Sequence, residues 1–112
     1  MAKLEREINA DFDELINRIE KGILDGSISA TIEDKSDFVN GDARCSVRVF
    51  ERYSAFGGNR LSLNVTLFQV GNCPIELSAI SAGGSQAVFF KVNTYGETAF
   101  LEALEEILEK EY

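Results

Sequence analysis

The fold of this chain is decided by one stretch, Ala43-Arg44-Cys45-Ser46-Val47-Arg48-Val49-Phe50-Glu51-Arg52-Tyr53-Ser54. In an extended strand, successive side chains point to opposite faces of the sheet. One face of this stretch then carries Cys45, Val47, Val49 and Tyr53. The opposite face carries Arg44, Ser46, Arg48, Phe50 and Arg52. We expect the first face to pack on a hydrophobic core and the arginine-bearing face to stay open to water or to a partner.

The length and composition predict a single domain over residues 1–112, because a chain of this size, 45% hydrophobic, buries a sufficient core. It contains no histidine, and its two cysteines, Cys45 and Cys73, lie far apart in sequence. This inventory excludes zinc motifs, Cys/His dyads and Ser/His/Asp triads. We therefore expect no metal site, no cofactor and no catalytic residue. Two free thiols are favoured over a disulfide between these cysteines.

The net charge of -8 is unevenly distributed along the chain. Residues 1–42 carry five basic and eleven acidic side chains, residues 43–93 carry five and two, and residues 94–112 carry one and six. An acidic total argues against nucleic acid as a partner, because nucleic-acid binding relies on a basic surface. No apolar run approaches the roughly 20 residues of a membrane span, and the first residues lack the apolar core of a signal peptide. We expect a cytoplasmic protein that binds neither nucleic acid nor membrane.

Two elements are predicted at the start of the chain. Residues 2–8 fit either a short edge strand or the frayed front of a helix, and the strand is favoured. Asp11 and Glu14 form a capping-box-like start for an amphipathic helix over residues 11–24. Gly26 is expected to end this helix in the left-handed conformation that glycine adopts most readily.

The strands on either side of the central stretch are predicted from alternation. Residues 27–34 alternate as a half-buried strand, and the polar residues 34–42 are expected to form a long connection. The strand after the central stretch covers residues 60–70 and turns its leucines and Val65 inward. Aligning the apolar faces of this hairpin places Val49 opposite Val65.

The C-terminal third is predicted to hold two more strands and a helix. The strands cover residues 75–82 and 86–93, and either face of the second could be the buried one. Thr94 and Glu97 fit a capping box for the final helix. Its apolar stripe consists of Phe100, Leu101, Leu104, Ile107 and Leu108.

Together these elements predict an α+β fold in the order β-α-β-β-β-β-β-α. Consecutive strands joined by tight turns favour an antiparallel meander sheet of five to six strands. Two amphipathic helices, each with one apolar stripe, must bury those stripes on one face of the sheet. One sheet face is therefore expected to be covered and the other to be open.

The first candidate site is an interface or anion-binding surface on the open face. We assign to it Arg44, Arg48, Phe50, Arg52 and Phe68. The arginines lie four residues apart, roughly 13 Å between neighbours, so they form a stripe and not one pocket. Arginine beside exposed aromatic residues is typical of protein interfaces. The alternative is a solvated face whose long side chains cover apolar surface.

Two further candidates are weaker. Glu51 is predicted to point inward between Val49 and Tyr53, and a buried carboxylate of this kind can serve as a base or a ligand anchor. The turn of Gly83, Gly84, Ser85 and Gln86 could bind an anion through its backbone N–H groups. Both have structural alternatives, namely a rim position for the carboxylate and a tight hairpin for the glycines.

Several strings carry a resemblance to a known family. They are Val49-Phe50-Glu51-Arg52-Tyr53-Ser54, Gly57-Gly58-Asn59-Arg60, the run from Ser81 to Lys91, and Asn93-Thr94-Tyr95-Gly96-Glu97. With them the chain resembles, over nearly its whole length, an uncharacterised family of small single-domain bacterial proteins, a domain of unknown function. The resemblance implies a bacterial, cytoplasmic protein and assigns no catalytic or binding residue. More loosely, the element order is similar to helix-grip folds, which hold small hydrophobic ligands between the sheet and the C-terminal helix.

Three hypotheses of function follow. The first is a non-enzymatic interaction module that self-associates as a homodimer through the open sheet face. The second is a carrier for an anionic or apolar small molecule, held between the sheet and the C-terminal helix. The third is an enzyme built on Glu51 and Tyr53, which is the weakest because the chain offers no histidine and no nucleophile motif.

Overall fold

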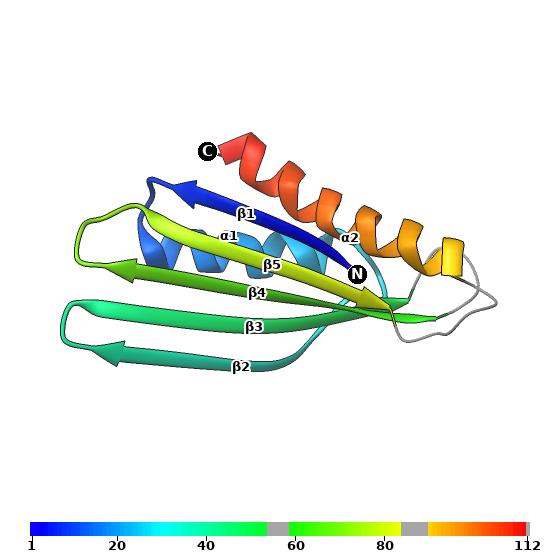
Figure 1. Ribbon diagram of the computed structural model, residues 1–112, viewed down its shortest axis with the longest axis horizontal. Helices are drawn as coiled ribbons and strands as arrows, with labels where there is room; N and C mark the ends of the chain where they lie inside the picture. Colours follow the sequence, from blue (N-terminus) through cyan, green and yellow to red (C-terminus); the bar gives the residue numbers. More distant parts are fainter. Residues whose placement is uncertain (54–58, 84–89, 112) are drawn as a thin grey trace.

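A computed structural model describes residues 1–53, 59–83 and 90–111, and Figure 1 shows the arrangement of their elements. The elements are β1 Ala2–Ile8, α1 Phe12–Asp25, β2 Thr31–Asn40, β3 Ala43–Tyr53, β4 Arg60–Val70, β5 Ile75–Gly83 and α2 Phe90–Glu111. The five strands form one antiparallel sheet in the order β1-β5-β4-β3-β2. Strands β2 to β5 are a meander, and β1 pairs with β5 as the edge strand on that side of the sheet.

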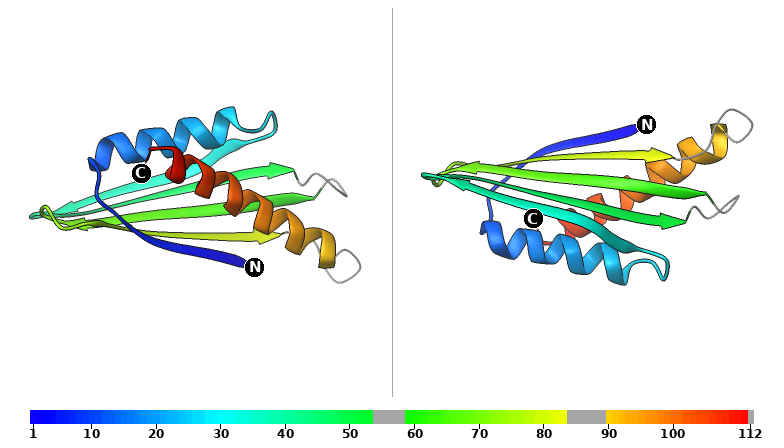
Figure 2. Two further views of the ribbon diagram at one scale, coloured as in Figure 1. Left: turned by 90° about the horizontal axis from the view of Figure 1, so that it is seen from above. Right: turned by 90° about the horizontal axis from the view of Figure 1, so that it is seen from below.

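Both helices pack on the same face of the sheet and leave the other face open (Figure 2). Helix α2 crosses β1, β5 and β4, while α1 lies beside it toward β2. The core between the layers is built from the apolar stripes of the helices and the inward side chains of β4 and β5. The α+β class and the two-layer arrangement predicted from the sequence are confirmed.

The first strand and the first helix form as predicted. Asp11 caps α1, since its carboxylate accepts a hydrogen bond from the Glu14 N–H at 3.0 Å. The buried stripe of α1 consists of Phe12, Leu15, Ile16, Ile19 and Ile23. The prediction for Gly26 is wrong, because its φ of -78° is right-handed and its N–H still bonds to the Gly22 carbonyl. Among the described glycines, Gly41 and Gly71 have positive φ angles, in two hairpin turns.

The strand expected over residues 27–34 is displaced toward the C-terminus. Residues 27–30 form a turn with Ile28 fully exposed, and the polar segment predicted as a connection is β2. A strand at the sheet edge pairs along one side only, and polar side chains suit it because water reaches them. The register shifts at Glu33, between Ile32 and Asp34, so the side-chain alternation changes phase there.

The central strand β3 forms where it was predicted but with its faces exchanged. Ser46, Arg48 and Phe50 are buried under the helices, whereas Val47 and Val49 lie on the open face. The hairpin register differs by one residue from the predicted one, since Val49 lies opposite Asn64. A shift of one residue moves every side chain of a strand to the other face.

Strand β5 and the final helix form as predicted, whereas the further strand predicted over residues 86–93 is wrong where the structure describes it. Strands β4 and β5 bury the predicted leucines and isoleucine. Helix α2 begins at Phe90, so residues 90–93 are helical where a strand was expected, and residues 84–89 lie outside the described residues. Thr94 is inside the helix and is not its cap. The apolar stripe of α2 is buried as predicted, with Ile107 half-buried.

Candidate functional site

The three arginines of β3 lie on the helix-covered face of the sheet, which corrects the first candidate site. The Arg44 guanidinium lies 3.9 Å from the centroid of the Phe12 ring and 2.9 Å from an Asp13 oxygen. Arg48 is 6% exposed. Arg52 lies 4.2 Å from the centroid of the Phe100 ring, under α2. The long arginine stems therefore extend the apolar core toward the helices.

Arg48 is the centre of a polar network that joins α1 to two strands. Its Nε lies 2.6 Å from a Glu20 oxygen, and its Nη1 lies 3.1 Å from an Asp37 oxygen. Burial alone lowers the pKa of the guanidinium, but the hydrogen bonds to both carboxylates outweigh it and the net shift is upward. The Asp37 carboxylate also accepts a hydrogen bond from the buried Ser46 hydroxyl at 2.6 Å, which together with Arg48 lowers its pKa.

A spacing in the sequence would have revealed this network. Asp13 and Glu20 are seven residues apart in α1, so they lie on one flank of the helix about 10.5 Å from each other. Arg44 and Arg48 are four residues apart in a strand, about 13 Å. The two spacings match closely enough for two ion pairs between helix and strand, and they require the arginine face to point at α1.

The open face of the sheet has an uncharged middle, which we call the neutral centre. It consists of Cys45, Val47, Val49, Asn64, Thr66, Phe68, Ser78 and Ile80. Phe68 is 40% exposed, and Phe38 of β2 extends the centre on the other side of Cys45 with 62% of its surface exposed. Of the five residues predicted for the open face, Phe68 is the one found there. Phe50 is fully buried on the helix-covered face.

Charged residues surround the neutral centre. Asp34 lies on the outer strand β2, and the open-face positions of β1 are Lys3, Glu5 and Glu7. Glu76, near the start of β5, lies opposite Glu7 in the strand register. At the opposite end of the sheet are Glu51 and Arg60. An uncharged middle with a charged border is the anatomy of a protein interface.

The prediction that Glu51 points inward is wrong, because the exchange of faces places it on the open side. It forms an ion pair with Arg60, which also reaches Glu33 at 3.5 Å. The Arg60 guanidinium lies 5.6 Å from the centroid of the Tyr53 ring. Coulombic attraction by Glu51 and the hydrogen bond to it raise the pKa of Arg60. Glu51 is therefore a half-buried carboxylate held in an ion pair, and not the inward-pointing buried carboxylate that the sequence predicted.

The predicted glycine turn is described only at its first residue. Gly83 ends β5, and its N–H donates a hydrogen bond to the buried carboxylate of Glu97, which also pairs with the Met1 amino group. Gly84, Ser85 and Gln86 lie outside the described residues. Phe100 and Leu61 are almost completely buried near this end of the sheet. Both residues belong to the core between the sheet and α2, and a cleft of about 240 Å³ lies farther along this seam, lined by Ile8 of β1 and Leu108 of α2.

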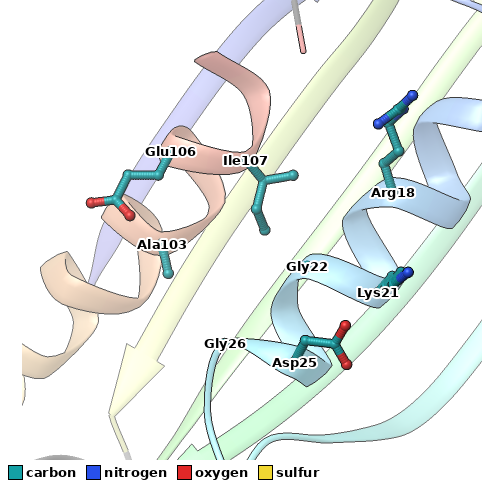
Figure 3. Close-up of a pocket in the computed structure, with 8 residues that line it drawn as sticks. All are labelled: Arg18, Lys21, Gly22, Asp25, Gly26, Ala103, Glu106 and Ile107. Carbon is teal, nitrogen blue, oxygen red and sulfur yellow. The ribbon is translucent and has the colours of Figure 1, made fainter. Parts of the chain in front are cut away.

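A cleft of about 530 Å³ lies between the two helices, with Gly22, Gly26 and Ala103 among its lining residues. Figure 3 shows that Ile107 points from α2 toward Gly22, whereas Glu106 points away from α1. Arg18 and Lys21 line the α1 side. The volume suits a small molecule, but its charged groups do not converge on one point as the polar groups of a ligand site do.

Other chemistry in the described residues is limited. Both cysteines are free, Cys45 half-buried and Cys73 exposed. No group of three or more acidic or cysteine side chains within the described ranges is arranged to hold a metal ion. Neither described helix is long and apolar enough to cross a membrane.

These features define a two-layer α+β protein, an open antiparallel sheet under two helices with an uncharged patch on its uncovered face. The chain belongs to the family of unknown function DUF6054, whose model matches residues 1–112. No curated protein and no solved structure matches the chain.

Proposed function

We propose that this protein is a non-enzymatic self-association module, in which a second copy of the chain covers the open sheet face. The neutral centre carries the proposal. In a chain with 27% charged residues, the middle of a broad face has none, and its aromatic side chains remain exposed. Interfaces lack charge at their core and carry it at their border.

The size of the face supports a second copy as the occupant. Five strands about 4.8 Å apart and about 30 Å long give a face on the order of 700 Å². A stable protein interface buries about 800 Å² from each partner. Two sheets stacked face to face pack about 10 Å apart with interdigitating side chains, as in β-sandwiches.

We further infer that the dimer works in the cytoplasm. The two free thiols, one of them exposed, favour a compartment that keeps cysteines reduced.

The test substitutes one residue of β2 and one of β4 on the open face, and its control is a neighbouring residue of β2 that points to the opposite face. We expect Phe38→Glu and Phe68→Glu to convert a dimer into a monomer, because each buries a charge in the neutral centre of the interface. The matched control is Val39→Glu, since Val39 is 75% exposed on the other face, and its mass should equal that of the wild type. Light scattering after size exclusion measures the masses over a wide range of protein concentration.

A wild-type chain that is monomeric throughout that range would disprove the proposal. A dimer that survives both phenylalanine substitutions would assign self-association to another surface. Circular dichroism of each variant verifies the fold, which should persist because both phenylalanines are substantially exposed in one copy.

A further inference from the structure

Arg52 differs from the other arginines of β3 in its counter-charge. Arg44 pairs with Asp13, and Arg48 pairs with two carboxylates. Arg52 contacts the ring of Phe100, and no carboxylate within residues 1–53, 59–83 and 90–111 pairs with it. The three arginines share one face of one strand, so the difference lies in what surrounds Arg52.

The surroundings of Arg52 are apolar on the side of the core. Phe100 has no exposed surface, and Leu61, the neighbour of Arg52 across the strand pair, is 1% exposed. Burial lowers the pKa of the Arg52 guanidinium. At the same end of the sheet the Glu97 carboxylate is already bound by the Gly83 N–H and the Met1 amino group.

The donor groups of Arg52 are nevertheless accessible. Every fully buried side-chain nitrogen or oxygen in the described part of the chain has a hydrogen-bond partner. The Arg52 nitrogen atoms have no partner there, so they are not completely enclosed, and the side chain as a whole is half-buried. A guanidinium carries five N–H donors in a rigid fork, and stacking one face on an aromatic ring leaves this fork free.

We propose that Arg52 is an anion-binding residue that receives the carboxylate or phosphate group of a small ligand, with Phe100 holding the guanidinium in place. The two oxygens of such a group match the fork of the guanidinium. A low-dielectric floor strengthens the attraction relative to water. This site lies on the helix-covered face, so it stands independently of the proposed dimer.

The test follows the arginine Nε–H signals by NMR while inorganic phosphate, and in a second series acetate, is added at constant ionic strength. We expect the Arg52 signal to shift saturably with at least one probe while the signals of Arg44 and Arg48 stay in place. The stronger response identifies phosphate or carboxylate as the preferred group. Signals that all shift by the same small amount, or a silent Arg52, would overturn the proposal.

Two variants make the assignment firm. Arg52→Gln should abolish the saturable shift that the backbone N–H signals of the neighbouring Leu61 and Phe100 show in the wild type. Arg44→Gln is the matched control, because Arg44 also stacks on a phenylalanine but already has a carboxylate. Its Arg52 signal should titrate as in the wild type. Loss of the response in Arg44→Gln but not in Arg52→Gln would refute the assignment.

Discussion

Asp37 shows how one side chain on an edge strand can be tied to the buried layer. Its carboxylate accepts hydrogen bonds from the Ser46 hydroxyl and from the Arg48 guanidinium, and both lower its pKa. A carboxylate whose folded pKa lies below its unfolded value stabilises the fold at pH values above the unfolded pKa. That contribution is lost as the pH falls through the folded value, below about pH 4.

We predict that Ser46→Ala raises the pKa of Asp37 toward its ordinary value of 3.8, because the hydroxyl is the largest cause of the shift. NMR titration of the Asp37 side-chain carboxyl carbon measures this directly. Ser78→Ala on the open face is the control and should leave the titration unchanged. An unchanged pKa in Ser46→Ala would mean that Arg48 alone holds the carboxylate.

At the scale of elements, the close approach of α1 and α2 depends on Gly22, which has no side chain. A Cβ built at Gly22 would lie 2.4 Å from Cδ1 and 2.7 Å from Cγ1 of Ile107. Real Cβ contacts are longer, so the helices approach closely at this point because α1 has glycine there. Glycine inside a helix costs about 1 kcal/mol relative to alanine, and the packing of Ile107 offsets this cost.

We predict that the effect of Gly22→Ala on the free energy of unfolding changes sign when the Ile107 side chain is truncated. Gly22→Ala alone should destabilise the fold by about 1–3 kcal/mol through overpacking. In the Ile107→Ala background the same change should stabilise it by up to about 1 kcal/mol, since only the helix propensity remains. Chemical denaturation of the four proteins measures the cycle. A stabilising effect in both backgrounds would show that Ile107 moves aside without cost.

The elements also show which sequence signals are reliable. The helical stripes and the leucines of β4 were predicted correctly. Each of these elements has only one strongly apolar face, and that face must be the buried one. Strand β3 was inverted, because valines on one face and Phe50 with three arginines on the other are both compatible with a core. The choice depends on Asp13 and Glu20 in α1, which no pattern within β3 contains. Strand β2 was mistaken for a connection because an edge strand needs no apolar face.

At the scale of the whole molecule, the candidate site changed more than the fold did. The sequence predicted an open face, and the structure has one, but four of the five residues assigned to it lie beneath the helices. The self-association proposal therefore rests on Phe38 and Phe68 and no longer on the arginines. Topology follows from the order of elements, whereas the identity of a surface depends on strand register, which a single residue can reverse.

The arginines beneath the helices determine how salt should act on the proposed dimer. Because their charges are directed inward, the border of the open face is left with an excess of carboxylates, and each copy carries a net charge of -8. Two copies that approach through this face repel each other, and ions screen such repulsion over about 8 Å at physiological ionic strength. We predict that raising the sodium chloride concentration tightens the dimer, measured as a lower dissociation constant in sedimentation equilibrium. A dimer that weakens in salt would require ion pairs across the interface.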